Sequence, residues 1–154
     1  MKRTKALLFL TLALCAALLT GEANPSGKLA ETLPLTYEDT PAARYFPGKQ
    51  QNVEYREGLY IGYRYFATAE KAVRFPFGYG MSYTTFAYSD MVADEQGVSL
   101  TVTNTGSVAG TEIVQLYVAK KNSELFRPAK ELKGFARVIF KPSSFTYWLV
   151  KMFA

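Results

Sequence analysis

The chain has 154 residues, about the length of one domain, and its 49% hydrophobic and 20% charged residues exclude a wholly disordered protein. Its net charge of +5 is not gathered into a Lys/Arg run longer than two residues, so we interpret it as solvated surface and not as a nucleic-acid interface. The absence of histidine excludes Ser-His-Asp and Cys-His catalysis and histidine-bearing metal sites, and a single cysteine, Cys15, excludes an intramolecular disulfide.

Residues 1–23 have the pattern of a secretory signal peptide. Residues 1–5 are basic, residues 6–19 are apolar apart from Thr11, and Gly21 and Ala23 place small residues before a cleavage site. The apolar run is shorter than the about 20 residues that cross a membrane, so we expect no stable membrane span. A functional leader predicts a secreted or periplasmic protein. The alternative is an N-terminal hydrophobic helix that belongs to a folded domain.

The next stretch is expected to connect two parts of a protein. Residues 21–51 are rich in Pro, Gly, Asn and Thr, which favours an extended linker over a helix. Residues 54–66, EYREGLYIGYRYF, place aromatic side chains at mixed spacing around Gly58 and Gly62. That pattern is compatible with a short helix or with an ordered loop.

From residue 84 onward the pattern predicts β-strands. Residues 98–103 alternate apolar and hydroxyl side chains, and residues 111–118 form a second such run after a turn at 104–106, where Asn and Gly tolerate left-handed backbone. Residues 84–92 and 132–140 are expected to be further strands, and residues 145–150 add a fifth if they pair. The fold class is therefore all-β, an antiparallel sandwich of immunoglobulin or fibronectin type III type. With four or five strands it is expected to be incomplete.

Five sequence blocks then resemble a known family. They are NPSGKLAETLP (24–34), YREGLYIGYRYF (55–66), FPFGYGMSYTTFAYSD (75–90), VTNTGSVAGTEIVQLYV (102–118) and RPAKELKGFARV (127–138). In this order and spacing they resemble the C-terminal part of glycoside hydrolase family 3, the β-glucosidase and β-xylosidase type. The resemblance implies that residues 24–74 are a linker and the end of an α/β-sandwich domain. It implies a truncated fibronectin type III-like domain at 75–142, followed by a divergent tail at 143–154 that fits a shifted reading frame.

The resemblance also implies a function. The family hydrolyses terminal, non-reducing β-linked sugars with an Asp nucleophile and a Glu acid/base, two carboxylates about 5–5.5 Å apart. Both lie in regions that precede the first matching block, and no residue of this chain matches either motif; the only tryptophan, Trp148, lies near the other end of the chain. We therefore expect an accessory part that is inactive alone, with no catalytic residue, cofactor or metal, whose partners are the catalytic domains of the parent hydrolase. The alternative is a secreted carbohydrate-binding or protein-interaction module that takes a β-linked oligosaccharide.

Aromatic side chains are the candidate contact residues. The stretch 75–86 holds five rings and two glycines, and we predict that four of its rings seat one domain on another: Phe75, Phe77, Tyr79 and Tyr83. Under the alternative function, the rings that would stack on a sugar are Tyr60, Tyr63, Tyr65 and Phe66. Glu54 and Glu57 would share a face if their stretch were helical, and Glu112 lies on a predicted strand beside Gln115. We interpret all three as solvated or capping acids.

Overall fold

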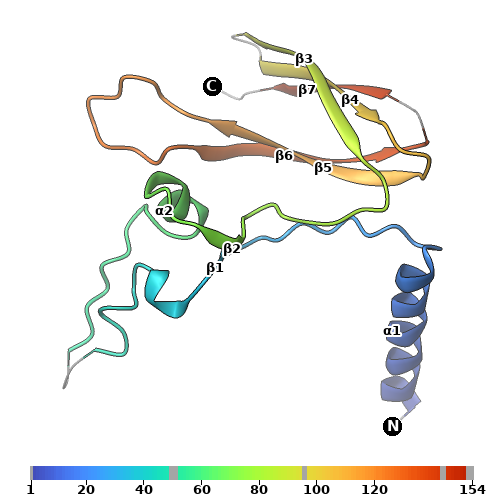
Figure 1. Cartoon of the computed structure of the whole chain (residues 1–154), viewed down its shortest axis with the longest axis horizontal. Helices are drawn as coiled ribbons and strands as arrows, with labels where there is room; N and C mark the ends of the chain where they lie inside the picture. Colours follow the sequence, from blue (N-terminus) through green and yellow to red (C-terminus); the bar gives the residue numbers. More distant parts are fainter. Residues whose placement is uncertain (1, 49–51, 95–96, 143–144, 152–154) are drawn as a thin grey trace. The chain divides into compact units, whose positions relative to one another are not determined.

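The computed structural model describes residues 2–48, 52–94, 97–142 and 145–151. Figure 1 shows the elements in chain order. They are α1 (Lys2–Thr20), β1 (Leu33–Pro34), the 3-10 turn η1 (Tyr37–Asp39), α2 (Tyr63–Thr68), β2 (Val73–Phe75), β3 (Phe86–Asp94), β4 (Gly97–Asn104), β5 (Gly110–Val118), β6 (Glu131–Phe140) and β7 (Phe145–Lys151). The strands form three small sheets: β1 with β2, β3 with β4 and β7, and β5 with β6.

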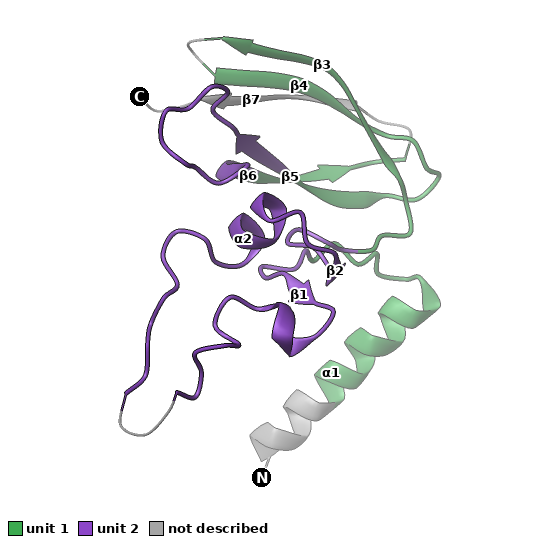
Figure 2. Ribbon diagram, turned by 60° about the vertical axis from the view of Figure 1, so that its left-hand side comes forward, with its two compact units in different colours: residues 1–27, 81–114, 136–154 green, residues 28–80, 115–135 purple. Residues whose placement is uncertain are grey.

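The chain divides into two compact units, which Figure 2 colours separately. Unit 1 comprises residues 1–27, 81–114 and 136–154, and unit 2 comprises residues 28–80 and 115–135. The division is discontinuous along the sequence. It falls inside the aromatic stretch 75–86, and it assigns residues 115–135 to the same unit as residues 28–80, so that β5 and β6 each contribute to both units.

The strands of unit 1 include the tail that follows residue 142. β4 is the central strand of its sheet and pairs antiparallel with β3, with Phe86 opposite Asn104. On its other side β4 pairs antiparallel with β7, with Thr103 opposite Phe145. A register irregularity in β3 falls where Asp90 has a φ of 53°, as in a β-bulge. Residues 145–151 therefore extend this sheet, while residues 143–144 and 152–154 of the expected tail lie outside the described residues.

Unit 1 is organised around a small apolar core. Its buried members are Leu100 and Val102 from β4, Val114 from β5 and Phe140 from β6. Phe86 packs against this group, with its ring centroid 5.3 Å from that of Phe140. The core thus takes side chains from both larger sheets, and it contains Leu100, Val102 and Val114 of the predicted apolar positions, whereas Val118 is exposed.

Two positions of the alternating strands depart from the expected pattern. Ser99 is 7% exposed and Glu112 is 9% exposed. A strand with one buried face would have left both of these polar side chains in water. Ser99 lies on the central strand of a three-stranded sheet, where neighbours cover both sides. Glu112 lies on the same side of β5 as buried Val114, because strand side chains alternate with period two.

The turn between β4 and β5 is closed by side chains and not by left-handed backbone. The chain turns between β4 and β5 as predicted, but neither Asn104 nor Gly106 has a positive φ, so left-handed backbone does not form the turn. Fully buried Asn104 instead accepts hydrogen bonds from Thr84 Oγ1 (2.5 Å) and Gly106 N (3.1 Å). Its Nδ2 donates to the carbonyls of Val108 (2.8 Å) and Lys141 (3.1 Å). Four bonds satisfy this amide, as burial requires.

Asn24 ties the start of the linker to two other loops of unit 1. Its Nδ2 donates to Ala109 O (2.9 Å), and its Oδ1 accepts from Ser82 Oγ (3.0 Å) and Tyr83 N (2.9 Å). Residues 21–23 form a turn and bends after α1, and Asn24 acts as a bridge and not only as a turn former.

Unit 2 has little regular structure. β1 and β2 pair antiparallel, with Leu33 opposite Phe75, and Leu29 exchanges backbone hydrogen bonds with Gly78 N (2.8 Å) and Tyr79 O (2.7 Å). The only α-helix described in this unit is α2, whose Phe66 is buried. Within residues 54–66, which the sequence left open between helix and loop, the helix begins only at Tyr63.

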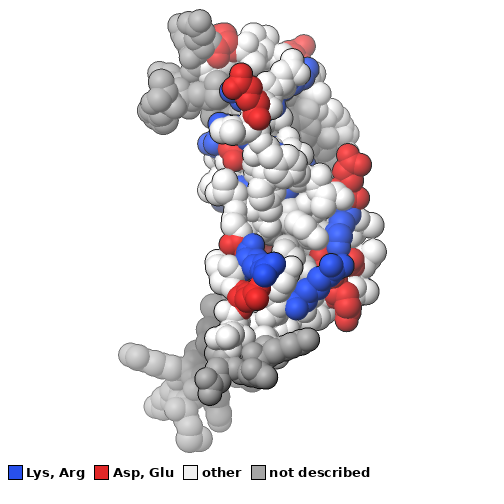
Figure 3. Space-filling view, turned by 90° about the vertical axis from the view of Figure 1, so that its left-hand side faces the viewer, with Lys and Arg blue, Asp and Glu red and all other residues white. Residues whose placement is uncertain are grey.

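The surface of the chain was considered for membrane-spanning helices and for charged patches. Large apolar side chains of α1 are exposed, namely Phe9, Leu10, Leu12, Leu14 and, most of all at 85%, Leu19, whereas Leu18 is half-buried. Among the described residues, none of the helices is both long and apolar enough for a membrane crossing. On the face shown in Figure 3, basic and acidic side chains are interspersed and no single-sign surface forms.

Candidate functional site

An aromatic cluster forms the centre of unit 2, and we define it as Tyr63, Phe66, Phe77 and Tyr117. The ring of Tyr63, on α2, lies 4.9 Å from Phe77 in a tilted arrangement and 5.7 Å from Tyr117 edge to face. These are the geometries that aromatic pairs prefer. The cluster therefore joins α2, the loop after β2 and strand β5 within the same unit.

The polar ends of the cluster are hydrogen-bonded. Tyr63 Oη accepts from Leu132 N (2.8 Å), and Tyr117 Oη donates to Gln115 Oε1 (2.6 Å). Burial raises the pKa of Tyr117, with Tyr63 as a second cause. Gln115 lies against the backbone of Gly78, where φ is +80° and an added Cβ would fall 2.5 Å from Gln115 Oε1. Gly78 is thus required both by its conformation and by close approach.

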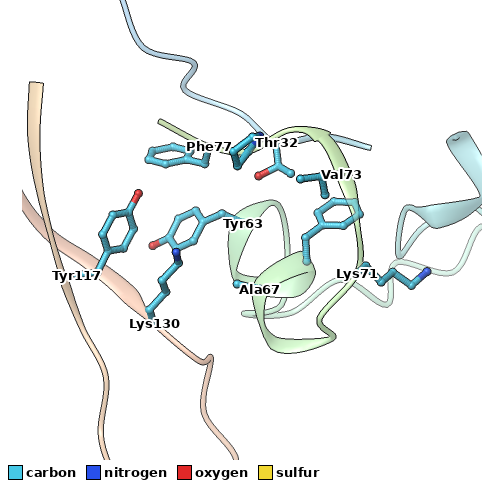
Figure 4. Close-up of a pocket in the computed structure, with 10 residues that line it drawn as sticks. Thr32, Tyr63, Ala67, Lys71, Val73, Phe77, Tyr117 and Lys130 are labelled. Carbon is cyan, nitrogen blue, oxygen red and sulfur yellow. The ribbon is translucent and has the colours of Figure 1, made fainter. Parts of the chain in front are cut away.

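A cavity of about 130 Å³ lies beside this cluster, and Figure 4 shows it. Its wall is formed by Thr32, Tyr63, Phe66, Ala67, Lys71, Val73, Pro76, Phe77, Tyr117 and Lys130. The Nζ of Lys130 lies 4.9 Å from the centroid of the Tyr117 ring, and Lys71 pairs with Asp39 at 3.6 Å. No carboxylate is among these lining residues, so the paired acids that glycoside hydrolysis needs do not occur in this cavity.

The four rings predicted for sugar stacking have partners inside unit 2. Tyr60 stacks on Phe126 with centroids 5.0 Å apart, Tyr63 belongs to the cluster, and Tyr65 meets Phe66 edge to face at 5.2 Å. Phe66 is only 6% exposed. These contacts favour packing over ligand stacking, and binding of an oligosaccharide stays a prediction.

The four rings predicted for domain seating fall into both units. Phe75 and Tyr79 pack on each other at 4.8 Å and Phe77 packs on Tyr63, all in unit 2. Tyr83 belongs to unit 1, where its hydroxyl donates to Leu18 O (2.5 Å). Tyr79 remains 39% exposed and Tyr83 49% exposed. Phe75 and Phe77 thus have internal partners, and the two tyrosines keep free faces.

The three carboxylates do not form a constellation. Glu54 precedes α2, so it does not share a helical face with Glu57, and its carboxylate pairs with Arg56 Nε at 2.5 Å. Glu112 is buried and accepts a hydrogen bond from Tyr88 Oη (2.9 Å), so its reading as a solvated or capping acid is wrong. Burial, and then the Glu112 carboxylate, raise the pKa of Tyr88. Within the described ranges, no three side chains of the metal-ligating kind gather in one place.

Sequence reasoning missed a second cavity in unit 2, of about 530 Å³. Its lining includes Thr32 and Arg64, and the Thr32 Oγ1 and Arg64 Nε atoms are buried without a hydrogen-bond partner. Arg64 lies between Tyr63 and Tyr65 in the sequence, and a charged residue inside an aromatic run was the available signal. The interior placement of Thr32 left no trace in the local pattern.

Comparisons with known proteins identify the region that this chain represents. A fibronectin type III-like domain model matches residues 112–146. The chain is 50% identical over 135 residues to thermostable β-glucosidase B of Acetivibrio thermocellus, which covers 82% of this chain and 18% of that protein. It is 40% identical over 153 residues to an exo-α-(1→6)-L-arabinopyranosidase of Bifidobacterium breve, covering 88% of this chain and 20% of that protein.

Solved structures also match this chain to part of a β-glucosidase. The chain superimposes with a TM-score of 0.82 and 40% identity on a GH3 β-glucosidase of Bifidobacterium adolescentis, covering 89% of this chain and 21% of that one. β-glucosidase 3B of Thermotoga neapolitana in complex with glucose gives a TM-score of 0.80 at 37% identity, over 90% of this chain and 20% of that one. The chain spans about a fifth of the length of such relatives. It therefore belongs to glycoside hydrolase family 3, and it corresponds to the C-terminal, fibronectin type III-like part of the family's β-glucosidases.

Proposed function

We propose that this chain is the accessory C-terminal part of a family 3 glycoside hydrolase that releases terminal, non-reducing β-D-glucosyl or related residues. The observation that carries the proposal is the 50% identity to a β-glucosidase over 82% of this chain but only 18% of that protein. The relatives include an arabinopyranosidase, so this region is shared by enzymes named for different glycosides. The part would serve the enzyme by packing on its catalytic domains, and no cofactor belongs to the proposal.

The chain alone is inactive under this proposal. Support comes from the lack of a motif that matches the family's Asp or Glu and from the separated positions of Glu54, Glu57 and Glu112. The test is hydrolysis of a chromogenic β-glucoside by the purified chain. We expect no turnover above a heat-denatured sample. Turnover that scales with the amount of the native chain would overturn the proposal.

Unit 1 is proposed to be the immunoglobulin or fibronectin type III-like sandwich of this part. Support comes from the core, in which Val102 of β4 meets Val114 of β5 and Phe140 of β6, strands that belong to different sheets. Side chains from two inner faces that share one core are typical of such sandwiches. Replacing Val102 and Val114 by cysteines and testing for a disulfide would probe this packing, since two unpacked sheets would leave both thiols free.

The aromatic stretch 75–86 is proposed to contact the catalytic domains. Tyr79 and Tyr83 supply exposed rings, and Phe75 and Phe77 hold the backbone of this stretch by packing inside unit 2. Tyr79→Ala and Tyr83→Ala should each weaken association with the catalytic domains several-fold, because buried tyrosines dominate many interfaces. Unchanged association of both variants, measured by calorimetry, would remove these rings from the interface.

Residues 1–23 are proposed to act as a secretory leader, which would place the protein in the periplasm or outside the cell. The basic start, the apolar run and the small residues before Asn24 support this, as do the exposed apolar side chains of α1. N-terminal sequencing of the protein recovered from a bacterial periplasm tests it. A new terminus near Asn24 is expected, and an unprocessed cytoplasmic product would refute the leader.

A further inference from the structure

Strand β5 has one edge that no other strand covers. β5 pairs with β6, and among the described residues it is not paired with a second strand. Figure 1 shows the two as neighbouring strands. Backbone N–H and C=O groups point to both sides of a strand, so an edge strand presents a row of donors and acceptors that another strand can use. The free edge of β5 therefore offers main-chain hydrogen bonds to a further strand.

The side chains of β5 do not protect this edge. Exposed strand edges are commonly blocked by charged side chains, prolines or bulges. The side chains that alternate with the buried ones along β5 are uncharged, namely Thr111, Ile113, Gln115 and Tyr117. The only charged residue of the strand, Glu112, is buried and accepts a hydrogen bond from Tyr88. A strand of this composition, rich in β-branched residues and without proline, favours pairing with another strand.

Two other edge strands, β3 and β6, carry the protection that β5 lacks. β3 has a register irregularity at Asp90, whose φ is 53°, and such a bulge interrupts regular pairing. β6 has the exposed basic side chains Lys133 and Arg137. A strand that paired with β3 would meet a distorted ladder, and two copies of β6 would bring like charges together. The best partner for the edge of β5 within this chain is therefore another β5.

We propose that the free edge of β5 pairs antiparallel with the same edge of a second copy of this chain, which joins two two-stranded β5–β6 sheets into one sheet of four strands. In one register, Val114 lies opposite Val114 and Ile113 lies opposite Gln115. Glu112 then lies opposite Leu116, so no like charges meet. Because both copies use the same edge, the contact closes at a dimer. The pairing does not depend on the proposed hydrolase partner.

The oligomeric state of the full chain tests this pairing. Sedimentation velocity over about a hundredfold range of protein concentration should show a monomer–dimer equilibrium, because association follows mass action. A chain that stays monomeric over this range would overturn the proposal. Species larger than a dimer would also overturn it, because an edge that pairs with its own copy is then fully used.

A positive charge on β5 should block the contact. Ile113→Lys should raise the dissociation constant of the dimer at least tenfold, because the two lysines would be diagonal neighbours across the new strand pair. The matched control is Ile139→Lys, the same change at a residue of β6 that is 71% exposed, and this variant should dimerise like the wild type. Equal weakening by both substitutions would show that apolar surface in general, and not the edge of β5, drives association, which would overturn the proposal.

A second variant of opposite charge separates a lost contact from a lost fold. Ile113→Glu should also dimerise poorly by itself. An equimolar mixture of Ile113→Glu and Ile113→Lys should recover the dimer, because opposite charges then replace like charges at the diagonal positions. Far-UV circular dichroism of each variant checks that its strands are retained. Two folded variants whose mixture stays monomeric would overturn the proposed pairing.

Amide hydrogen exchange of the wild-type chain keeps the proposal falsifiable if the Ile113 variants do not fold. Exchange in residues 111–118 should slow as the concentration rises, whereas exchange in β3 should not change. Slowing that is equal in both strands, or protection of β5 that does not change on dilution, would overturn the proposal. Protection of β5 that appears only when β-glucosidase B of Acetivibrio thermocellus, shortened by the aligned stretch, is added would assign the edge to the hydrolase and overturn self-pairing.

Discussion

Two regions of the chain differ in how well their side chains are satisfied. They are the turn between β4 and β5 and the stretch from Leu33 to Ile61. At the turn, Asn104 is fully buried and four hydrogen bonds satisfy its amide. In the second region, Leu59 and Ile61 are exposed, and the neighbouring Arg64 has a buried Nε without a partner. In the first region every polar group of the buried amide has a hydrogen-bond partner. In the second, apolar side chains are exposed and one buried N–H lacks a partner. The difference shows that one chain can contain a region whose buried polar groups are all hydrogen-bonded and another whose apolar side chains stay exposed.

The largest expected effect comes from removing the amide that closes the turn. Asn104→Ala leaves the hydroxyl of Thr84, the N–H of Gly106 and two carbonyls without this partner. We expect the free energy of unfolding to fall by about 3–4 kcal/mol, because buried polar groups that lose partners each cost about 1–3 kcal/mol. Urea unfolding followed by circular dichroism measures it.

The control is Asn52→Ala, since Asn52 is exposed. A comparable loss in both variants would end the claim that the turn is held by the Asn104 side chain.

A smaller loss should follow from adding one methyl group beside the turn. In Gly110→Ala the new Cβ would lie 2.5 Å from Thr84 Cγ2 and 3.2 Å from Phe86 Cζ. Such overpacking costs about 1–3 kcal/mol. Thr84→Ser in the same chain removes the clashing methyl, keeps the hydroxyl and should restore part of the stability. Gly27→Ala, which meets nothing within 4 Å, is the control; if Gly110→Ala melts like it, the close packing is refuted.

Ionisation of the Tyr88 hydroxyl, which donates to the buried carboxylate of Glu112, should lower the stability of the fold at alkaline pH. The raised pKa of Tyr88 means that its hydroxyl stays protonated in the folded chain while the unfolded chain ionises near pH 10. The stabilisation is therefore complete below about pH 10 and is lost as the pH rises further. Tyr88→Phe should cost about 1 kcal/mol at pH 7, where the bond to Glu112 is lost, and should flatten the alkaline limb.

Tyr55→Phe is the control for this titration, because Tyr55 is 81% exposed. An alkaline limb that is equally steep in the wild type and in Tyr88→Phe would assign it to other groups.

The smallest effect on folding is expected for the exposed apolar side chains of the stretch from Leu33 to Ile61. Leu59→Ser and Ile61→Ser should change the free energy of unfolding by less than about 0.5 kcal/mol, as is usual for exposed positions. The same variants should reduce the fluorescence of a dye that binds exposed apolar surface. Val102→Ala, at a residue that is 1% exposed, should cost about 2 kcal/mol and is the buried reference. A loss at Leu59 as large as at Val102 would contradict the comparison.

Local patterns predicted much of the strand structure because they report on single elements. The alternation in residues 98–103 reappears as β4, with Val98, Leu100 and Val102 buried. Residues 145–150, whose pairing the pattern left as a possibility, occur in β7 beside β4. The five sequence blocks also pointed to the family that the comparisons support. The sandwich arrangement, the leader and the contact surface for the catalytic domains remain proposals.

The sequence by itself determined where strands form and which family this chain belongs to, because side-chain period and ordered motifs are written along one dimension. Only the tertiary structure decided that Asn24 and Asn104 bridge distant loops and that Glu112 is buried under the hydroxyl of Tyr88. It also placed Thr32 and Arg64 in the wall of one cavity. These roles join residues that are up to 85 positions apart, and hydrogen bonding and burial across such separations leave no local pattern.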